Sequence, residues 1–233
     1  MSLSEYYEEI LYPLQNGVLN VVRDLDVPFY LTGGTALSRG YFAHRYSDDL
    51  DFFTNNDENF HENVNLVLAK LKENGFEWDA DSGLIRSETF ASLGLSHSET
   101  DALLKIDFVN DVVPHYGDFV CSDIFPRLDN VRNILSNKLG AVFRFSGKDI
   151  ADIREIARHE LFNWAEVISE ARNKDGSVEA NVIAEIVQAV PMTAFEEIRW
   201  SEPAPTWDSF IDDIVQIVRD LVSCGENSLY KEK

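Results

Sequence analysis

Apolar residues recur along the chain in two kinds of pattern, and the pattern changes near residue 125. Before that point, short apolar runs that predict strands alternate with segments of helical spacing, whereas only helical spacing follows it. The predicted strands are Val27–Thr32, Asp49–Phe53 and Ala102–Val109, and the predicted helices of the first part are residues 4–24, 36–42 and 60–74. Those of the second part are residues 130–145, 149–162, 163–172, 181–190 and 207–224. We therefore expect a mixed α/β domain over residues 1–125 and a helical domain over residues 126–233.

Breaker residues refine this prediction in two places. Pro13 and Gly17 are expected to interrupt the first helix. Proline lacks the N–H that a helix interior needs, and glycine destabilises a helix interior. Residues 76–95 predict several short extended segments with Gly83 and Gly94 at turns.

Two aspartates separated by one leucine begin the second predicted strand. Residues i and i+2 of a strand point to the same face, so Asp49 and Asp51 share a face while Leu50 turns into the core. Two neighbouring carboxylates repel each other unless a cation lies between them, and a divalent metal ion is the natural candidate. The alternative is a solvated acidic turn, but Phe52 and Phe53 continue the apolar strand, where an unpaired charge is costly.

A third aspartate interrupts the apolar strand at residues 102–109. The alternation places Lys105, Asp107 and Val109 on one face, and the opposite face carries Leu104, Ile106 and Phe108. A neighbouring strand would bring Asp107 beside the first pair of carboxylates. The alternative is an aspartate at a sheet edge, paired with Lys105 or with nothing.

A Gly-Gly-Thr sequence separates the first predicted strand from the next helix. Glycines at a strand-to-helix turn let backbone N–H groups approach a phosphate, and the helix N-terminus attracts negative charge. Thr35 can cap the helix or bind a phosphate oxygen. Alternatively, Gly33, Gly34 and Thr35 form only a tight turn with an ordinary cap.

Composition and charge narrow the classes of function. The chain has 233 residues, 45% of them hydrophobic, and a formal net charge of −21. This acidity argues against an extended nucleic-acid surface, because phosphate contacts supply most nonspecific affinity, but it allows a local basic pocket around one nucleotide. No apolar run is long enough to span a membrane, the N-terminus does not look like a secretory signal, and there are only two cysteines. We expect a cytoplasmic protein.

Two blocks of sequence carry a resemblance to a known family. The first is Leu31-Thr-Gly-Gly-Thr-Ala-Leu37 with Arg45-x-Ser47-x-Asp49-Leu-Asp51-Phe-Phe53, and the second runs from Lys138-Leu-Gly-Ala through Arg144 to Lys148-Asp149 and Asp152-Ile153. Over residues 25–160 the chain resembles the AbiEii/AbiGii-type toxin nucleotidyltransferases of the DNA polymerase beta superfamily. The resemblance implies an α+β nucleotidyltransferase fold, in which helices flank a mixed sheet, followed by a helical C-terminal domain.

The resemblance also implies a reaction and a role for each residue. Asp49, Asp51 and Asp107 would be the catalytic and metal-binding residues, holding two Mg²⁺ ions, with Asp107 as the base. The enzyme, of the EC 2.7.7 type, would transfer a nucleoside monophosphate from an NTP to RNA, protein or a small molecule. The nucleotide-binding residues would be Gly33, Gly34, Thr35, Arg45, Ser47, Lys138, Arg144 and Lys148. Asp149 and Asp152 would orient these cations, and a cognate antitoxin is a possible partner.

Other functions stay open at this point. The chain could be a catalytically silent nucleotide-binding module, or an aminoglycoside-type transferase whose acidic surface attracts a cationic substrate. Each basic residue could instead be a solvated surface residue. The five histidines lack the spacing of zinc ligands. Ser38, Ser47 and Cys121 have no recognisable base partner, which argues against a hydrolase triad.

Overall fold

The computed structural model describes residues 1–79 and 83–231, and all of these except Asp101 include the side chain. The chain divides into two compact units. The first comprises residues 1–112 and 118–129, and the second comprises residues 113–117 and 130–233. The predicted domain limits of 1–125 and 126–233 stay a prediction.

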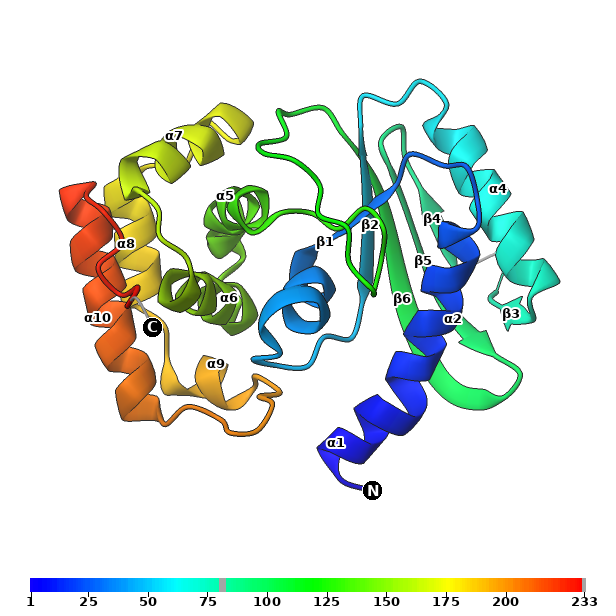
Figure 1. Cartoon of the computed structure of the whole chain (residues 1–233), viewed down its shortest axis with the longest axis horizontal. Helices are drawn as coiled ribbons and strands as arrows, with labels where there is room; N and C mark the ends of the chain where they lie inside the picture. The colour runs from blue at the N-terminus through cyan, green and yellow to red at the C-terminus, as the bar shows by residue number, and fades with distance from the viewer. Residues whose placement is uncertain (80–82, 232–233) are drawn as a thin grey trace. The chain divides into compact units, whose positions relative to one another are not determined.

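A mixed sheet forms the centre of the first unit (Figure 1). Its strand order is β1-β2-β6-β5-β3, and β4 also pairs with β5. Strand β2 runs parallel to β6, whereas β1 is antiparallel to β2 and β5 is antiparallel to β6. The strands are β1 (Tyr30–Thr32), β2 (Leu50–Asn55), β3 (Phe76–Glu77), β4 (Leu84–Arg86), β5 (Phe90–His97) and β6 (Thr100–Asp111).

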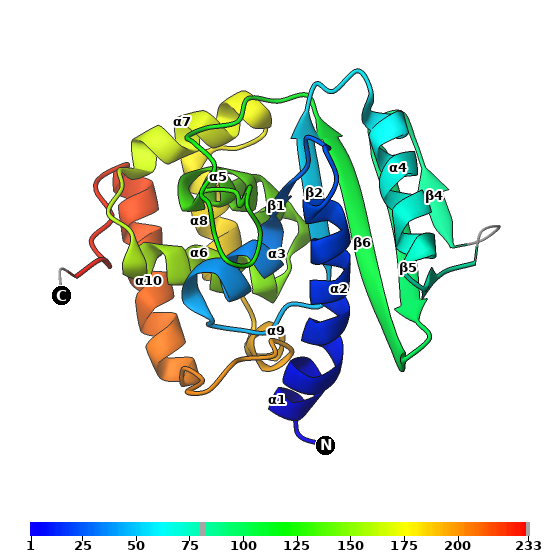
Figure 2. The same cartoon turned by 45° about the vertical axis from the view of Figure 1, so that its right-hand side comes forward.

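Helices cover the apolar face of this sheet. In Figure 2, α2 and α4 both lie in front of the sheet, α2 to the left of β6 and α4 to its right. Phe52 and Phe108 stack on each other at that face, and Phe29 links Phe108 to Phe60 of α4. The helical elements of the unit are α1 (Leu3–Tyr6), the π-helix η1 (Tyr7–Leu11), α2 (Tyr12–Arg23), α3 (Gly33–Thr35), the π-helix η2 (Ala36–Phe42) and α4 (Phe60–Glu73).

The strand alternation expected from the sequence is present in β6. Leu104, Ile106 and Phe108 are fully buried, whereas Lys105 is exposed and Asp107 is half-buried. The apolar face of β6 therefore packs into the core, and its other face carries the polar side chains of Lys105 and Asp107.

Local details differ from the prediction where tertiary contacts decide them. The chain stays helical across Pro13, and the π-helix η1 passes into α2 at Tyr12, one residue before the proline. Gly17 continues the helix, and a Cβ atom there would lie 2.9 Å from the ring of Phe76, so glycine allows close packing. Strand β1 is shorter than Val27–Thr32, and β2 begins one residue after Asp49.

The second unit is helical. The fully buried Trp164 is part of its core. The sequence pattern does not predict α9. The elements are α5 (Val131–Ala141), the 3₁₀-helix η3 (Val142–Arg144), α6 (Gly147–His159), α7 (Trp164–Lys174), α8 (Ala180–Gln188), α9 (Met192–Glu196) and α10 (Trp207–Ser223).

Candidate active site

Two of the predicted catalytic aspartates lie directly opposite each other in the sheet. In the register of the parallel strands β2 and β6, Asp51 is the partner of Asp107. Neighbouring strands lie about 4.8 Å apart, so both carboxylates leave the same face at short separation. Asp49 comes immediately before β2, two residues from Asp51. The fold therefore assembles the acidic cluster from segments more than fifty residues apart in sequence.

Two polar side chains hold the carboxylate of Asp107. The hydroxyl of Ser92, the partner of Asp107 on β5, donates a hydrogen bond of 2.6 Å to Oδ1. Lys105 Nζ lies 2.5 Å from Oδ2. The orientation of this carboxylate is thus set from two sides.

All three aspartates raise the pKa of Lys105. Its partial burial works to lower its pKa, but the hydrogen bond and charge of Asp107 outweigh it, and the charges of Asp49 and Asp51 add to them. The net result is a raised pKa for Lys105. The ammonium of Lys105 is therefore in direct contact with Asp107 and is stabilised at longer range by Asp49 and Asp51.

The glycine turn lies against the acidic cluster. Gly33 has a φ of +73°, and a Cβ atom on it would lie 2.2 Å from Asp51 Oδ2. A Cβ atom on Gly34 would lie 2.5 Å from Arg45 Nη2 and 2.9 Å from Ser47 Oγ. Glycine at both positions leaves room for the side chains of three other predicted site residues, and at Gly33 it also suits the positive φ.

The segment leading into β2 is fixed to its surroundings. Thr35 Oγ1 donates a hydrogen bond of 2.5 Å to the carbonyl of Asp49. Gln15 is fully buried and donates to the carbonyls of Ser47 and Asp48. Tyr7 donates from its hydroxyl to Asp48. These contacts hold the backbone at the start of the Asp-x-Asp motif.

Arg45 is almost entirely buried, at 3% exposed. Its Nη1 donates a hydrogen bond of 3.0 Å to the carbonyl of Tyr46, and its Nη2 lies beside Gly34. The guanidinium thus places a positive charge beside the glycine turn, where it would favour a bound anion.

The second basic block lies in the second unit. Lys138 is buried and forms ion pairs of 2.8 Å with Asp149 and 2.7 Å with Asp152. Arg144 pairs with Asp149 at 2.9 Å but is 68% exposed. Lys148 is half-buried in the first turn of α6. Asp149 and Asp152 therefore form ion pairs with basic side chains, in line with the expectation that they orient these residues.

The acidic cluster could hold a magnesium ion only together with substrate phosphates. Within residues 1–79 and 83–231, no group of three or more Asp, Glu, His or Cys side chains is arranged to hold a metal ion by itself. Mg²⁺ is usually bound by one or two carboxylates together with substrate phosphates, rather than by a cage of protein ligands. Asp51 and Asp107, opposite each other beside the glycine turn, supply such a donor set.

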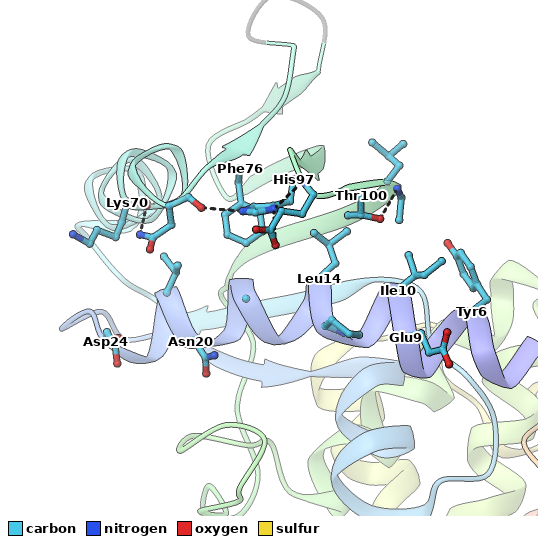
Figure 3. A pocket seen from close by; sticks show the side chains of 17 residues that line it. Tyr6, Glu9, Ile10, Leu14, Asn20, Asp24, Lys70, Phe76, His97 and Thr100 are labelled. Atoms are coloured by element: carbon cyan, nitrogen blue, oxygen red, sulfur yellow. Dashed lines mark hydrogen bonds and ion pairs between the residues drawn. The ribbon is translucent and has the colours of Figure 1, made fainter.

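A groove of about 1080 Å³ lies elsewhere on the first unit (Figure 3). It runs along α1, η1 and α2 and faces the end of the β5–β6 hairpin, with side chains such as Ile10, Leu14, Phe76, His97 and Thr100 at its walls. None of the predicted site residues lines it. The groove therefore does not mark the predicted chemistry.

Comparison with known proteins identifies the family. Residues 20–226 match the family described as "Nucleotidyl transferase AbiEii toxin, Type IV TA system". The chain belongs to this family. The match covers most of both units, so AbiEii membership extends beyond residues 25–160, where the sequence resemblance was recognised. None of the curated proteins matches the chain at a significant level.

Solved structures share the fold of this AbiEii-family chain. JHP933 from Helicobacter pylori superposes with a TM-score of 0.64 at 18% identity, covering 96% of this chain and 93% of that one. The "putative nucleotidyltransferase from H. pylori" gives a TM-score of 0.63 at 17% identity, covering 96% of both chains. The expected fold is confirmed: a mixed sheet with flanking helices, followed by a helical region. AbiEii membership supports a role in nucleotidyl transfer.

Three residues at the candidate site of this AbiEii-family chain were not predicted as functional. Ser92 holds Asp107, and Gln15 and Tyr7 hold the segment before Asp49. The sequence carries no signal for these contacts except that Gln15 interrupts the apolar face of a helix.

Among the helices of the described ranges, none is long and apolar enough to cross a membrane.

Proposed function

We propose that this chain is a Mg²⁺-dependent nucleotidyltransferase that transfers a nucleoside monophosphate from an NTP to an acceptor hydroxyl. The observation that carries the proposal is the register of β2 and β6, which sets Asp51 opposite Asp107, with Gly33 against the Asp51 carboxylate. The type IV description of the family supports a toxin role, a cognate antitoxin and a cytoplasmic location.

Each residue contributes position or charge to the proposed reaction. Asp49, Asp51 and Asp107 would hold Mg²⁺, which would supply positive charge to neutralise the phosphates. The turn at Gly33, Gly34 and Thr35 binds the β- and γ-phosphates through backbone N–H groups.

The acceptor side of the reaction depends on Asp107. The acceptor oxygen bonds to the α-phosphorus as the bond to pyrophosphate breaks, and its proton passes to the Asp107 carboxylate. Ser92 keeps that carboxylate turned toward the acceptor, which lowers the cost of orienting it. Arg45 and Ser47 support the phosphate turn. Lys138, Arg144 and Lys148 lie in the second unit, and their role as nucleotide ligands stays a prediction from the sequence.

Labelled donors test the proposal and separate it from its alternatives. The purified protein is incubated with Mg²⁺ and each NTP, labelled at the α- or the γ-phosphate, and with total RNA, lysate protein or an aminoglycoside. Nucleotidyl transfer places α-label but no γ-label on one acceptor, and EDTA abolishes it. NTP binding by calorimetry without transfer to any acceptor would instead indicate a silent nucleotide-binding module.

A matched pair of variants ties the activity to the acidic cluster. Asp51→Asn keeps the size of the side chain but removes the charge, and we expect transfer to fall by at least about 100-fold with little change in melting temperature. Asp111→Asn is the control. Asp111 lies on the same face of β6 as Asp107 but four residues, or about 13 Å, further along the strand. Equal transfer by the Asp51→Asn variant and the unmodified protein would contradict the proposed mechanism.

A further inference from the structure

Phe145 has a backbone conformation that its residue type disfavours. It follows η3 with a φ of +55° and ψ of 33°, and its N–H donates to the carbonyl of Val142. In this left-handed region a Cβ atom clashes with the backbone, so glycine or asparagine is the usual choice. A phenylalanine at this position needs a reason beyond the geometry of the turn.

Packing does not supply that reason. The side chain of Phe145 is 72% exposed, compared with 37% for Phe119. Within residues 1–79 and 83–231, no aromatic ring or cation contacts the Phe145 ring. Single exposed apolar residues are common on protein surfaces. An exposed aromatic ring on a disfavoured backbone is not, because neither feature stabilises the fold.

The residue before it is an arginine held from one side only. Arg144 Nη2 lies 2.9 and 3.1 Å from the two carboxylate oxygens of Asp149, which is itself 2% exposed. In the part of the chain that the structure describes, Arg144 Nε and Nη1 have no partner. The guanidinium is thus anchored, yet it keeps donors that point away from its anchor. Such an arginine loses little conformational freedom when it binds a phosphate.

We propose that Arg144 and Phe145 form a nucleotide-binding corner, in which a nucleobase stacks on the Phe145 ring and Arg144 binds the adjoining phosphate. Exposed aromatic rings beside cations are the usual platform for unpaired bases, and stacking tolerates any base. Lys148, four residues after Arg144, adds positive charge near this corner of a chain whose net charge is −21. The choice of a nucleotide as ligand rests on the proposed function, and the corner is argued from the second unit alone.

Binding measurements on the full chain test the corner without relying on catalysis. The probes are the four NTPs, a fluorescent single-stranded 12-mer RNA and tripolyphosphate, which carries phosphate but no base. All are measured without Mg²⁺ and repeated on the Asp51→Asn variant. The NTP and RNA measurements distinguish a donor nucleotide from an RNA acceptor as the source of the base.

Phe145→Gly is the decisive variant, because it removes the ring and relieves the backbone at once. We expect an equal or higher melting temperature but about 5- to 100-fold weaker binding of the NTP, the RNA or both, with unchanged binding of tripolyphosphate. Phe145→Asn, which also suits the left-handed conformation, should weaken binding in the same way. Phe145→Trp keeps an aromatic ring and should bind the NTP and the RNA about as tightly as the unmodified chain. Arg144→Gln should weaken the binding of tripolyphosphate in addition to that of the NTP and the RNA. It should also reduce the salt dependence of these binding constants.

The control is Leu161→Ala, which shortens a side chain of similar exposure, 65%, in the same unit. It should leave every affinity unchanged. If the Phe145→Gly and Phe145→Asn variants bind NTPs and RNA as tightly as the unmodified chain, the corner is not a base-binding site. If base binding depends on Phe145 but no label is ever transferred, the corner stands and the proposed transferase activity fails.

Discussion

Substitution of Gly33 by alanine is the most direct test of how the turn and the acidic cluster depend on each other. The added methyl group would lie 2.2 Å from Asp51 Oδ2 and 3.0 Å from Asp51 Cγ. An ordinary carbon–oxygen contact is longer by about 1 Å. The Asp51 carboxylate must therefore move or rotate by about that distance, away from its place opposite Asp107.

The two effects of this substitution differ in size. Alanine at a φ of +73° costs about 1–2 kcal/mol, which corresponds to a fall of about 2–8 °C in melting temperature and leaves a domain of ordinary stability folded. A misplacement of about 1 Å at a reacting centre costs about 100-fold in rate. We therefore expect Gly33→Ala to lose most of its transfer activity while it still folds.

The assay combines thermal unfolding with Mg²⁺-dependent transfer of α-labelled nucleotide. Gly75→Ala is the matched control, because Gly75 has a φ of +83° in the same unit and its Cβ atom would meet only the side chain of His97, at 3.1 Å. It should show a similar fall in melting temperature and normal transfer. Wild-type transfer by a folded Gly33→Ala protein would refute the close dependence of Asp51 on the turn.

Two further predictions concern the lysines that pair with aspartates. Lys105→Gln removes the cation that competes with a divalent ion for the acidic cluster, so Mn²⁺ should bind at least about 3-fold more tightly in an electron paramagnetic resonance titration. Weaker Mn²⁺ binding would show that Lys105 does not compete with the metal. Lys138→Met leaves two buried carboxylates without their shared cation and should cost about 3–5 kcal/mol in urea unfolding, whereas Lys70→Met, at an exposed pair, should have little effect.

Local pattern was sufficient for the parts of the site that lie within one stretch of chain. The alternation around Asp107 depends on the two-residue period of a strand, and β6 keeps it. The glycine turn followed by Asp-x-Asp was recognisable because both parts fall within about twenty residues. Breaker residues were less informative: Gly17 sits inside a continuous helix, because a distant ring, that of Phe76, packs against it.

What the sequence by itself determined was the set of residue types, the face of each strand on which they lie, and the family to which they point. Only the tertiary structure decided that Asp51 pairs with Asp107, that Ser92 holds the same carboxylate, and that Gly33 leaves room for Asp51. The reason is physical. Periodicity is a property of neighbouring residues, whereas strand register depends on contacts between segments far apart in the chain, and no local pattern encodes it.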